Sequence, residues 1–485
     1  MCGIWCCFHN KEEKTDTGVW YLSKRGPDQI VSTILENVVL GFTHLRINGW
    51  SSQPLQSGRW WVLCNGEIFN HKKLEEELGI VAPPNSSDCW ILPYMFETYG
   101  PEKTCTKLDG EFAIIAYDSQ ENKLYACRDL FGIKPLFYGR TDNAFYVSSE
   151  IKALNTHNAE WVQPGTYMTI DSSFNAITTQ YRPRSYFKID IPENDFISAI
   201  RETLITAVEK RCMSDKPVAA LLSGGLDSSI ICSILSKQVS ELHTFSVGML
   251  DSPDLYHARI VADHIGSIHH ELILEPEDFK DAVDSVIRDI ESYDITTVRA
   301  SVGNWLLGEY IARTTDFKVI FNGDGSDELL GGYLYFNRAP SDSEFENEIG
   351  RLLNEIHMYD VLRSERSMSS HGLESRTPYL DHDFVALCRS IPTKLIRNEK
   401  ALLRKAFEGW LPPEILYRRK EAFSDGVSMN PWFTRDNEKE YYSDIFSKYY
   451  KHRIIPHMWM PRWSPDTQDP SARTLSIYKK EGSYT

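Results

Sequence analysis

The sequence lacks the features of membrane, zinc-finger and secreted proteins. No apolar run reaches about 20 residues, the length that a membrane-spanning helix needs. The ten cysteines form no CxxC pairs with zinc-finger spacing, so we expect reduced thiols in a cytosol-like compartment. The N-terminus, Met1-Cys2-Gly3-Ile4, shows no secretory signal. A formal net charge of −16 argues against binding to nucleic acid or to an anionic membrane. We therefore expect a cytoplasmic protein that acts on small molecules.

The length of the chain predicts more than one domain. Its 485 residues exceed an ordinary single core, and 42% hydrophobic with 25% charged residues is typical of a globular enzyme. Pro183 and the polar stretch Ile191-Pro192-Glu193-Asn194-Asp195 indicate a linker. We interpret residues 2–188 and 195–485 as the two domains.

Each domain has its own pattern of strands and helices. In the first, strands at both ends with helices between them predict an α+β fold with mostly antiparallel pairing. Its expected strands are 38–47, 60–64, 112–117 and 124–127, and its expected helices are 72–78 and 90–99. In the second, alternating strands and helices predict an α/β fold, with a parallel sheet and a ligand at the carboxyl ends of its strands. Its expected strands are 217–222, 243–247, 269–274 and 317–321, and its expected helices are 196–208, 230–235, 257–265 and 279–290.

A glycine-rich turn, Leu221-Leu222-Ser223-Gly224-Gly225-Leu226-Asp227-Ser228-Ser229, follows the first strand of the second domain. Adjacent glycines let the backbone approach a ligand, and the serines open a helix whose free N–H groups favour an anion. The turn is not a Walker motif, because no lysine follows the glycines. An ordinary Ser/Gly turn is the alternative. Asp227 inside a phosphate site instead favours Mg²⁺ held between protein and phosphate.

Further charged residues are expected to contact the phosphate groups of a ligand bound at this turn. Asn322-Gly323-Asp324-Gly325-Ser326-Asp327-Glu328 follows another strand, so Asp227 and Asp327 would leave the same edge of the sheet and could share Mg²⁺. Composition alone also fits a plain loop. Lys400 on an expected helix and Arg418-Arg419-Lys420 could neutralise departing pyrophosphate, although such clusters are usually solvated surfaces.

The N-terminus places a thiol where it could act as a nucleophile. Removal of Met1 would leave Cys2 with its own α-amino group, which can serve as the local base. An unreactive cysteine is the plain alternative. Asn65-Gly66-Glu67 follows an expected strand and suits an oxyanion hole. Arg46 could hold a carboxylate and Asp88 an ammonium group.

Several segments of the first domain resemble the class II, N-terminal-nucleophile (Ntn) glutamine amidotransferases. They are residues 1–4, 25–28, 65–70, 109–113 and 128–136. The resemblance implies an αββα sandwich that hydrolyses glutamine and releases ammonia internally. The residues that it implies are Cys2 as nucleophile, Asn65 and Gly66 as oxyanion hole, and Arg46, Glu67 and Asp88 as further contacts to glutamine.

The chain departs from this family pattern at two places. Lys24 stands where the family usually has His before Arg-Gly-Pro-Asp. His44-Leu45-Arg46 stands where the order is usually His-Arg-Leu, and Arg46 keeps an arginine within reach.

Taken over both domains, the chain resembles the glutamine-hydrolysing asparagine synthetases, and its tail resembles their eukaryotic branch. The segments that carry the resemblance are 223–229, 251–255, 262–267, 293–301, 331–336, 421–426 and 469–475. It implies a PP-loop ATP pyrophosphatase fold for the second domain, ATP as co-substrate with Mg²⁺, and an apolar ammonia channel between the domains. Asp324 is an implied catalytic residue that replaces the family's Glu, so its carboxylate is one methylene shorter.

The resemblance assigns further residues to ligands. Those implied to bind ATP are Leu221, Ser223, Gly224, Gly225, Asp227, Ser228, Ser229, Val247, Asn322, Gly323, Lys400 and Lys420. Those implied to bind aspartate are Thr297, Arg299 and Ser301, and those implied to bind the metal are Asp227 and Asp327.

The implied reaction turns ATP, aspartate and glutamine into asparagine, glutamate, AMP and diphosphate through β-aspartyl-AMP. One alternative is a relative that adenylates another carboxylate, although such relatives typically lack a working N-terminal cysteine. An amidotransferase feeding a sugar phosphate would lack the glycine-rich turn. A regulatory protein that keeps both pockets without turnover is a third alternative. The sequence leaves the oligomeric state open, with a homodimer as one option.

Overall fold

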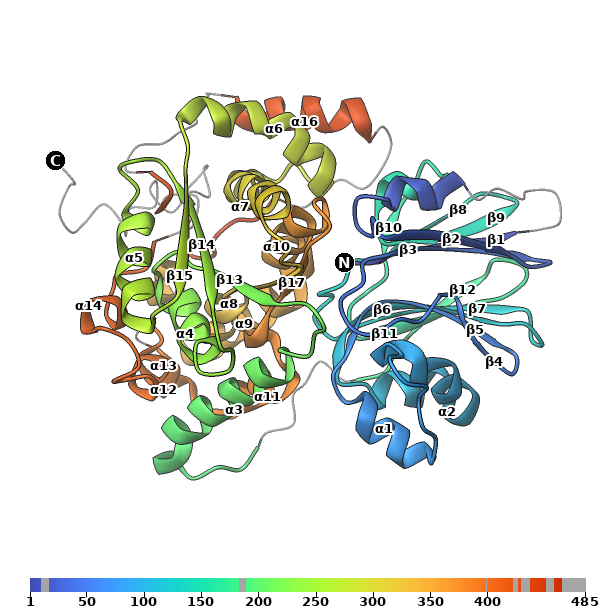
Figure 1. The fold of residues 1–485 in the computed structure, drawn as a ribbon, viewed down its shortest axis with the longest axis horizontal. Coiled ribbons are helices and arrows are strands. Elements are labelled where there is room, and N and C mark those ends of the chain that lie inside the picture. The colour runs from blue at the N-terminus through green and yellow to red at the C-terminus, as the bar shows by residue number, and fades with distance from the viewer. Residues whose placement is uncertain are drawn as a thin grey trace.

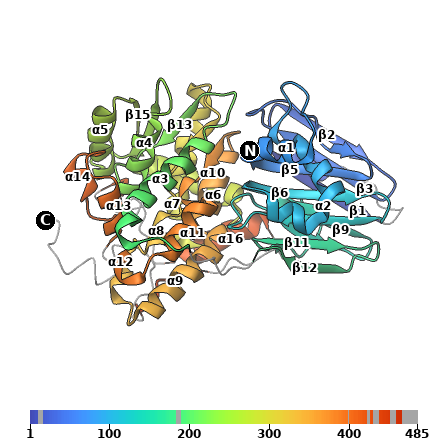
Figure 2. The same ribbon diagram turned by 90° about the horizontal axis from the view of Figure 1, so that it is seen from below.

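The computed structural model describes residues 1–9, 17–182, 189–397, 399–421, 426–428, 437–450 and 458–464. These residues form two lobes that lie side by side (Figure 1). The N-terminal lobe contains antiparallel sheets and the C-terminal lobe a parallel sheet wrapped in helices. The N-terminus itself lies between the lobes in both views (Figures 1 and 2).

Two antiparallel six-stranded sheets build the N-terminal lobe. The first sheet has the order β10 (Glu160–Trp161), β8 (Phe137–Arg140), β9 (Ala144–Ser148), β1 (Gly3–His9), β3 (Val38–His44) and β2 (Gln29–Ile34). The second has the order β12 (Ala176–Gln180), β11 (Thr166–Ile170), β7 (Lys123–Arg128), β6 (Gly110–Asp118), β5 (Trp60–Ile68) and β4 (Leu55–Ser57).

Alternation of side chains along the strands produces two apolar layers in this lobe. Phe42 of β3 and Leu63 of β5 belong to one core cluster, between the two sheets. Val62 and Cys64 of β5 face the other way, toward α1 (His71–Leu78) and α2 (Leu92–Lys107). Short 3₁₀ turns, Thr17–Leu22 and Ile151–Ala153, pack on the outer face of the first sheet.

A five-stranded, all-parallel sheet forms the centre of the C-terminal lobe. Its order is β15 (Ile268–Ile273), β14 (His243–Gly248), β13 (Val218–Leu221), β16 (Val319–Phe321) and β17 (Glu374–Arg376). Core clusters on both faces confirm that helices cover the sheet on both sides. One face packs on α3 (Phe196–Lys210), α4 (Leu226–Leu235) and α5 (Pro253–Ile265). The other packs on α6 (Pro276–Ile290) and α7 (Ile295–Thr314).

The remaining helices of the described residues lie around the parallel sheet in the C-terminal lobe (Figures 1 and 2). They are α8 (Ser326–Leu330), α9 (Asp342–Glu355), α10 (Asp360–Ser369), α11 (His382–Ser390), α12 (Thr393–Ile396), α13 (Ala401–Ala406), α14 (Pro413–Leu416) and α16 (Glu438–Tyr449). The mixed α+β and α/β fold class is thus confirmed. Most of the 421–426 motif and all of 469–475 lie outside the described residues.

Candidate active sites

Cys2 lies immediately before β1, at the boundary of the two lobes. Its Sγ is 3.5 Å from the backbone N of Leu45 and 3.7 Å from the Leu45 carbonyl oxygen. The Arg25 Nε donates a hydrogen bond of 2.9 Å to the Cys2 carbonyl oxygen. Two segments distant in sequence therefore fix the position of this thiol.

The surroundings of Cys2 favour uncharged groups. Burial raises the pKa of the Cys2 thiol to about 12. Burial also lowers the pKa of the neighbouring amino group, carried here by Met1, to about 5. Met1 is fully buried and its amino group bonds to the Leu373 carbonyl oxygen at 3.2 Å. An amine in such a place stays neutral at pH 7, which is the form that can accept a proton from the thiol.

Asn65 and Gly66 meet the requirements of an oxyanion hole. Neither polar atom of the fully buried Asn65 side chain has a hydrogen-bond partner among the described residues. Buried amides are normally satisfied, so this one is available to a ligand. Gly66 has φ +153°, and a Cβ there would lie 2.0 Å from the Glu111 carbonyl oxygen. Only glycine fits that close approach of two strands.

Two carboxylates lie near this amide. Burial, with Asp88 nearby, raises the pKa of Glu67 well above its usual range. Asp88 accepts the backbone N–H of Ile68 at 2.6 Å, and burial raises its pKa too. Glu67 Oε2 has no partner among the described residues. An incoming ammonium group would pair with these carboxylates, as predicted for the head of glutamine.

Arg46 follows β3, two residues after the strand ends at His44. Its side chain is exposed, and its guanidinium stacks 5.5 Å from the centre of the Trp50 ring. His44, which the sequence interpretation did not select, is buried instead, and its Nδ1 has no hydrogen-bond partner among the described residues.

The glycine-rich turn occupies the carboxyl end of β13 and opens α4, as expected. Gly224 has φ +68°, and a Cβ there would clash with the backbone of α5. Gly323, at the end of β16, would place a Cβ 2.8 Å from the backbone N of Ser228. The glycines therefore allow three backbone segments to converge at one edge of the sheet.

A cavity of about 220 Å³ opens at this edge. The predicted ATP contacts that line it are Leu221, Ser223, Gly225, Asp227, Ser228, Val247, Asn322, Gly323, Lys400 and Lys420. Gly224 and Ser229 are not among the lining residues, and Ser229 Oγ donates to the Gly225 carbonyl oxygen at 2.7 Å.

Lys400 joins the two predicted metal ligands. Its Nζ lies 2.7 Å from Asp227 Oδ2 and 2.5 Å from Asp327 Oδ1. Lys420 lies 2.5 Å from Asp327 Oδ2. Burial alone would raise the pKa of Asp327, but Lys400 and Lys420 hold it well below its usual range. Lys400 was expected on a helix, but it precedes α13. Its backbone has φ +64°, which turns its side chain toward the carboxylates.

The donor set fits a small divalent cation. Asp227 and Asp327 are close enough to share one ammonium group, so they could share Mg²⁺. Mg²⁺ usually takes one or two carboxylates and completes its coordination with phosphate oxygens and water. Across the described part of the chain, His, Cys, Asp and Glu side chains form no group of three that could hold a metal. Such a site would therefore depend on the phosphates of a bound nucleotide.

The far wall of the cavity contains a second charged group. Asp324 lines the cavity and pairs with Arg363 of α10 at 2.6 Å. Burial raises the pKa of Asp324, against the lowering effect of Arg363. Arg363 also lies 3.1 Å from Asp360. The sequence interpretation missed Arg363 and Asp360, because α10 lies far from the glycine-rich turn in sequence.

Helix α7 contributes one face to the cavity. Its lining residues are Thr296, Thr297, Ala300, Asn304 and Leu307, at helical spacing. Of the residues predicted to bind aspartate, Thr297 is thus in place. Arg299 points away and pairs with Glu438 of α16. Ser301 is buried, and its Oγ donates to the Thr297 carbonyl oxygen at 2.7 Å.

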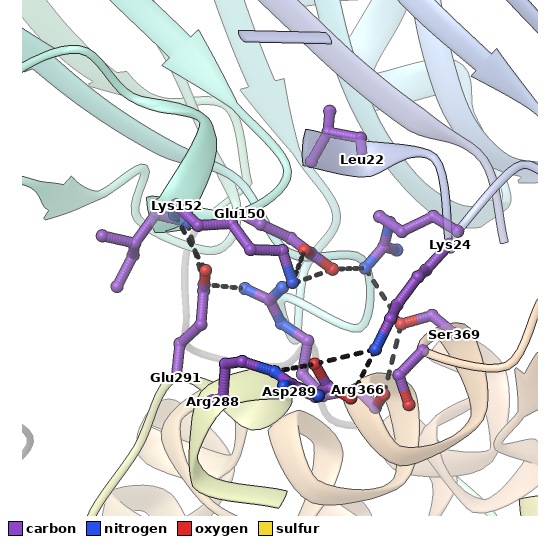
Figure 3. A network of polar contacts seen from close by, with 12 residues as sticks. Leu22, Lys24, Glu150, Lys152, Arg288, Asp289, Glu291, Arg366 and Ser369 are labelled. Carbon is purple, nitrogen blue, oxygen red and sulfur yellow. Dashed lines mark hydrogen bonds and ion pairs between the residues drawn. The ribbon is translucent and has the colours of Figure 1, made fainter. Parts of the chain in front are cut away.

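A buried ionic network connects the lobes next to Cys2. Arg25 pairs with Glu150 at 2.9 Å and with Glu365 of α10. Arg366, also on α10, reaches Glu150 at 2.7 Å and Glu291 at 2.8 Å (Figure 3). All five side chains are at most 5% exposed. Because an unpaired charge here would be costly, the network fixes the lobes in one arrangement.

The two sites define the class of the protein. A cysteine at the start of an antiparallel sandwich, with an unsatisfied buried amide in the same lobe, is the arrangement of an amidotransferase. A glycine-rich turn with acidic and basic side chains at the edge of a parallel sheet is the arrangement of a nucleotide-dependent enzyme. The chain is therefore an amidotransferase joined to a synthetase.

Comparisons with known proteins identify the family. Residues 1–190 match the glutamine amidotransferase domain, and residues 199–352 and 337–455 match asparagine synthase. The glutamine-hydrolysing asparagine synthetase of Homo sapiens is 37% identical over 562 aligned residues, which cover 99% of both chains. That of Bos taurus is 38% identical over 558 residues, with the same coverage. The chain belongs to the family of glutamine-hydrolysing asparagine synthetases.

Proposed function

We propose that the chain synthesises asparagine from aspartate, with glutamine as the nitrogen donor and ATP as the driving co-substrate. The observation that carries the proposal is the presence of two complementary sites in one chain. One offers a nucleophile and an unsatisfied buried amide in the same lobe, and the other a cavity with charges suited to a polyphosphate. The glutamine-hydrolysing asparagine synthetases that are similar to the chain align with almost all of it.

In the amidotransferase site, Cys2 attacks the side-chain carbonyl carbon of glutamine. After removal of Met1, the Cys2 amino group accepts the thiol proton and delivers it to the departing ammonia. The Asn65 side-chain N–H and the Gly66 backbone N–H stabilise the oxyanion that forms. Water then hydrolyses the thioester and releases glutamate. Glu67 and Asp88 hold the α-ammonium group of the substrate.

In the synthetase cavity, the β-carboxylate of aspartate attacks the α-phosphorus of ATP. A carboxylate–phosphorus bond forms, and the bond to the β-phosphate breaks to release diphosphate. The backbone around Ser223, Gly225 and Ser228 holds the phosphates, while Lys400 and Lys420 balance the charge of the leaving group. Asp227 and Asp327 would hold Mg²⁺, which supplies further charge neutralisation when bound. Leu221, Val247 and Gly323 border the adenine.

Ammonia then attacks the acyl carbon of β-aspartyl-AMP, so that the amide forms and AMP leaves. Asp324 lies in the cavity, where it can accept a proton from the attacking nitrogen. Ammonia reacts only when unprotonated, and the adenylate must be kept from water. The buried ion pairs that join the lobes support a closed interface for this transfer.

Product analysis tests this proposal. The enzyme is supplied with ATP, Mg²⁺, aspartate and glutamine, and then with ammonium in place of glutamine. We expect asparagine, AMP and diphosphate in equal amounts from both nitrogen sources. Glutamate release without asparagine or diphosphate would contradict it and would favour a different carboxylate as the acceptor, to be found by screening other acids.

We further propose a cytoplasmic enzyme without nucleic-acid or membrane partners, based on the charge and the cysteine usage. No helix of the described residues is both long and apolar enough to span a bilayer. Association into a homodimer remains a hypothesis, which sedimentation of the purified chain would test.

A further inference from the structure

Strand β14 holds the glycine-rich turn beyond the point where its pairing with β13 ends. The last pair of the ladder between the two strands is Leu221 and Phe245. The next residue, Leu222, donates its backbone N–H to the Phe245 carbonyl oxygen at 2.9 Å. Its carbonyl oxygen accepts a hydrogen bond from the Ser246 hydroxyl. Strand β14 therefore fixes both backbone polar groups of the residue that enters the turn.

The hydrogen bond from Ser246 to Leu222 lies between the two ends of the proposed nucleotide site. Leu222 directly precedes Ser223, the first residue of the turn that would contact the phosphates. Ser246 directly precedes Val247, which would border the adenine. All four residues line the cavity. This hydrogen bond therefore fixes the phosphate end of the site relative to its adenine end.

His269, on the edge strand β15, contacts the hydroxyl that makes this bond. It pairs in register with Thr244 of β14, and its side chain is fully buried. Its Nδ1 lies 2.8 Å from Thr244 Oγ1, and its Nε2 lies 3.3 Å from Ser246 Oγ. Ser267 Oγ lies 2.9 Å from Thr244 Oγ1. These four side chains form one continuous chain of hydrogen bonds that ends at the Leu222 carbonyl group.

The direction of each hydrogen bond follows from its final acceptor. A carbonyl oxygen only accepts, so Ser246 must donate its one hydroxyl proton to Leu222 and accept from His269 Nε2–H. A neutral imidazole has one N–H, so Nδ1 accepts from Thr244, which in turn accepts from Ser267. In the other tautomer, an unprotonated Nε2 would compete with Leu222 for the Ser246 proton.

The surroundings of His269 keep its imidazole neutral. Burial lowers the pKa of His269 to about 4, and Arg259 of α5 and His270 act in the same direction. Glu271 lies 3.7 Å from His269 Nε2 but pairs with Arg259 at 2.9 Å. The His270 side chain points to the other face of β15 and hydrogen-bonds to His243 at 2.9 Å. The ring is therefore uncharged at pH 7 and acts through the position of its N–H group.

We propose that His269, as the neutral Nε2–H tautomer, is a positioning residue for ATP. It directs the Ser246 hydroxyl to the Leu222 carbonyl oxygen and so sets the distance between the adenine and phosphate ends of the site. This assignment deepens the proposed function, on which it rests. ATP must occupy both ends, so loss of the hydrogen bond weakens its binding. Diphosphate occupies only the phosphate end and should bind as before.

The test compares the binding of ATP and of diphosphate to the full-length protein, each with Mg²⁺, by calorimetry. We expect Ser246→Ala and His269→Asn to weaken ATP binding about three- to tenfold, the effect of one net hydrogen bond, without changing diphosphate binding. The Asn amide reaches only as far as Nδ1, whereas the amide of His269→Gln reaches the position of Nε2 and should restore most of the affinity. Adding His269→Asn to Ser246→Ala should weaken ATP binding no further, because His269 acts through Ser246.

A spectroscopic measurement and a matched control make the result specific. Nitrogen NMR of protein with ¹⁵N-labelled histidine should show a neutral Nε2–H imidazole that disappears in His269→Asn. His270→Asn, the same change at the next residue, is the control and should bind both ligands like the wild type. The inference is overturned if the His269 proton is on Nδ1, if both ligands weaken equally or not at all, or if the two substitutions add. A wild-type protein that does not bind ATP would instead refute the proposed function itself.

Discussion

Lys400→Met tests the electrostatic design of the synthetase cavity. Lys400 is only 5% exposed and holds Asp227 and Asp327 together. Removing one partner of a buried ion pair costs about 3–5 kcal/mol, because charges are left unpaired. Lys420 still pairs with Asp327, and Ser326 Oγ donates to Asp227 at 2.8 Å, so we expect about 3 kcal/mol. At about 2 °C per kcal/mol, the melting temperature of the synthetase lobe should fall by about 6 °C.

The ligand and pH dependence of this variant separate electrostatics from packing. ATP with Mg²⁺ should stabilise Lys400→Met more than the wild type, because a divalent cation replaces the missing positive charge. The lysines lower the pKa of Asp327 in the folded state, so their contribution is present above the unfolded value of about 4 and is lost as the pH falls below it. The difference in stability between wild type and variant should therefore shrink in acid.

Scanning calorimetry at pH 7.5 and pH 3, with and without ATP and Mg²⁺, measures these effects. Lys405→Met, the same change at an exposed position one turn further along the chain, is the control and should melt like the wild type. Equal melting of Lys400→Met and wild type, or equal stabilisation by the nucleotide, would refute the reasoning. Glutamine hydrolysis by the variant should persist, since Cys2 lies in the other lobe.

Three further changes test the coupled sites. Cys2→Ala should abolish asparagine synthesis from glutamine but not from ammonium, and loss of both activities in a folded protein would contradict the assignment. Asp324→Glu should keep or raise the synthesis rate, because the longer carboxylate still reaches Arg363; a large loss would show that the backbone is adapted to Asp. Glu365→Gln should lower glutamine hydrolysis about tenfold, since it weakens the hold on Arg25, which positions Cys2. An equal fall in ammonia-dependent synthesis would indicate general destabilisation instead.

The sheet architecture could be predicted where apolar residues, or strands and helices, alternate regularly along the chain. The predicted strands 60–64 and 112–117 are the neighbouring antiparallel strands β5 and β6. Alternating strands and helices after residue 217 correctly gave the parallel sheet. The fully buried strand β1 and the three-residue strand β17 were missed, because neither shows alternation long enough to identify.

The site residues could be predicted where they are contiguous in the sequence. They could not be predicted where their role depends on the direction in which a side chain points. The glycine-rich turn, Asp327 and Asn65 could be selected directly, because each follows or ends a predicted strand. Arg299 was chosen from a motif, but α7 was not recognised as a helix, so the face on which Arg299 lies could not be known.

Strand β17 explains how the two sites are connected. It is the edge strand of the synthetase sheet, yet Arg376 at its end lies 3.5 Å from Glu67 in the amidotransferase pocket. The carbonyl oxygen of the same residue accepts the backbone N–H of Asn322, which lines the synthetase cavity, at 3.1 Å. One residue therefore contacts the pocket where ammonia would be released and the strand end where it would be used. Because β17 pairs with β16 in the sheet core, a shift of the glutamine pocket would be transmitted to Asn322 rather than absorbed by a loop.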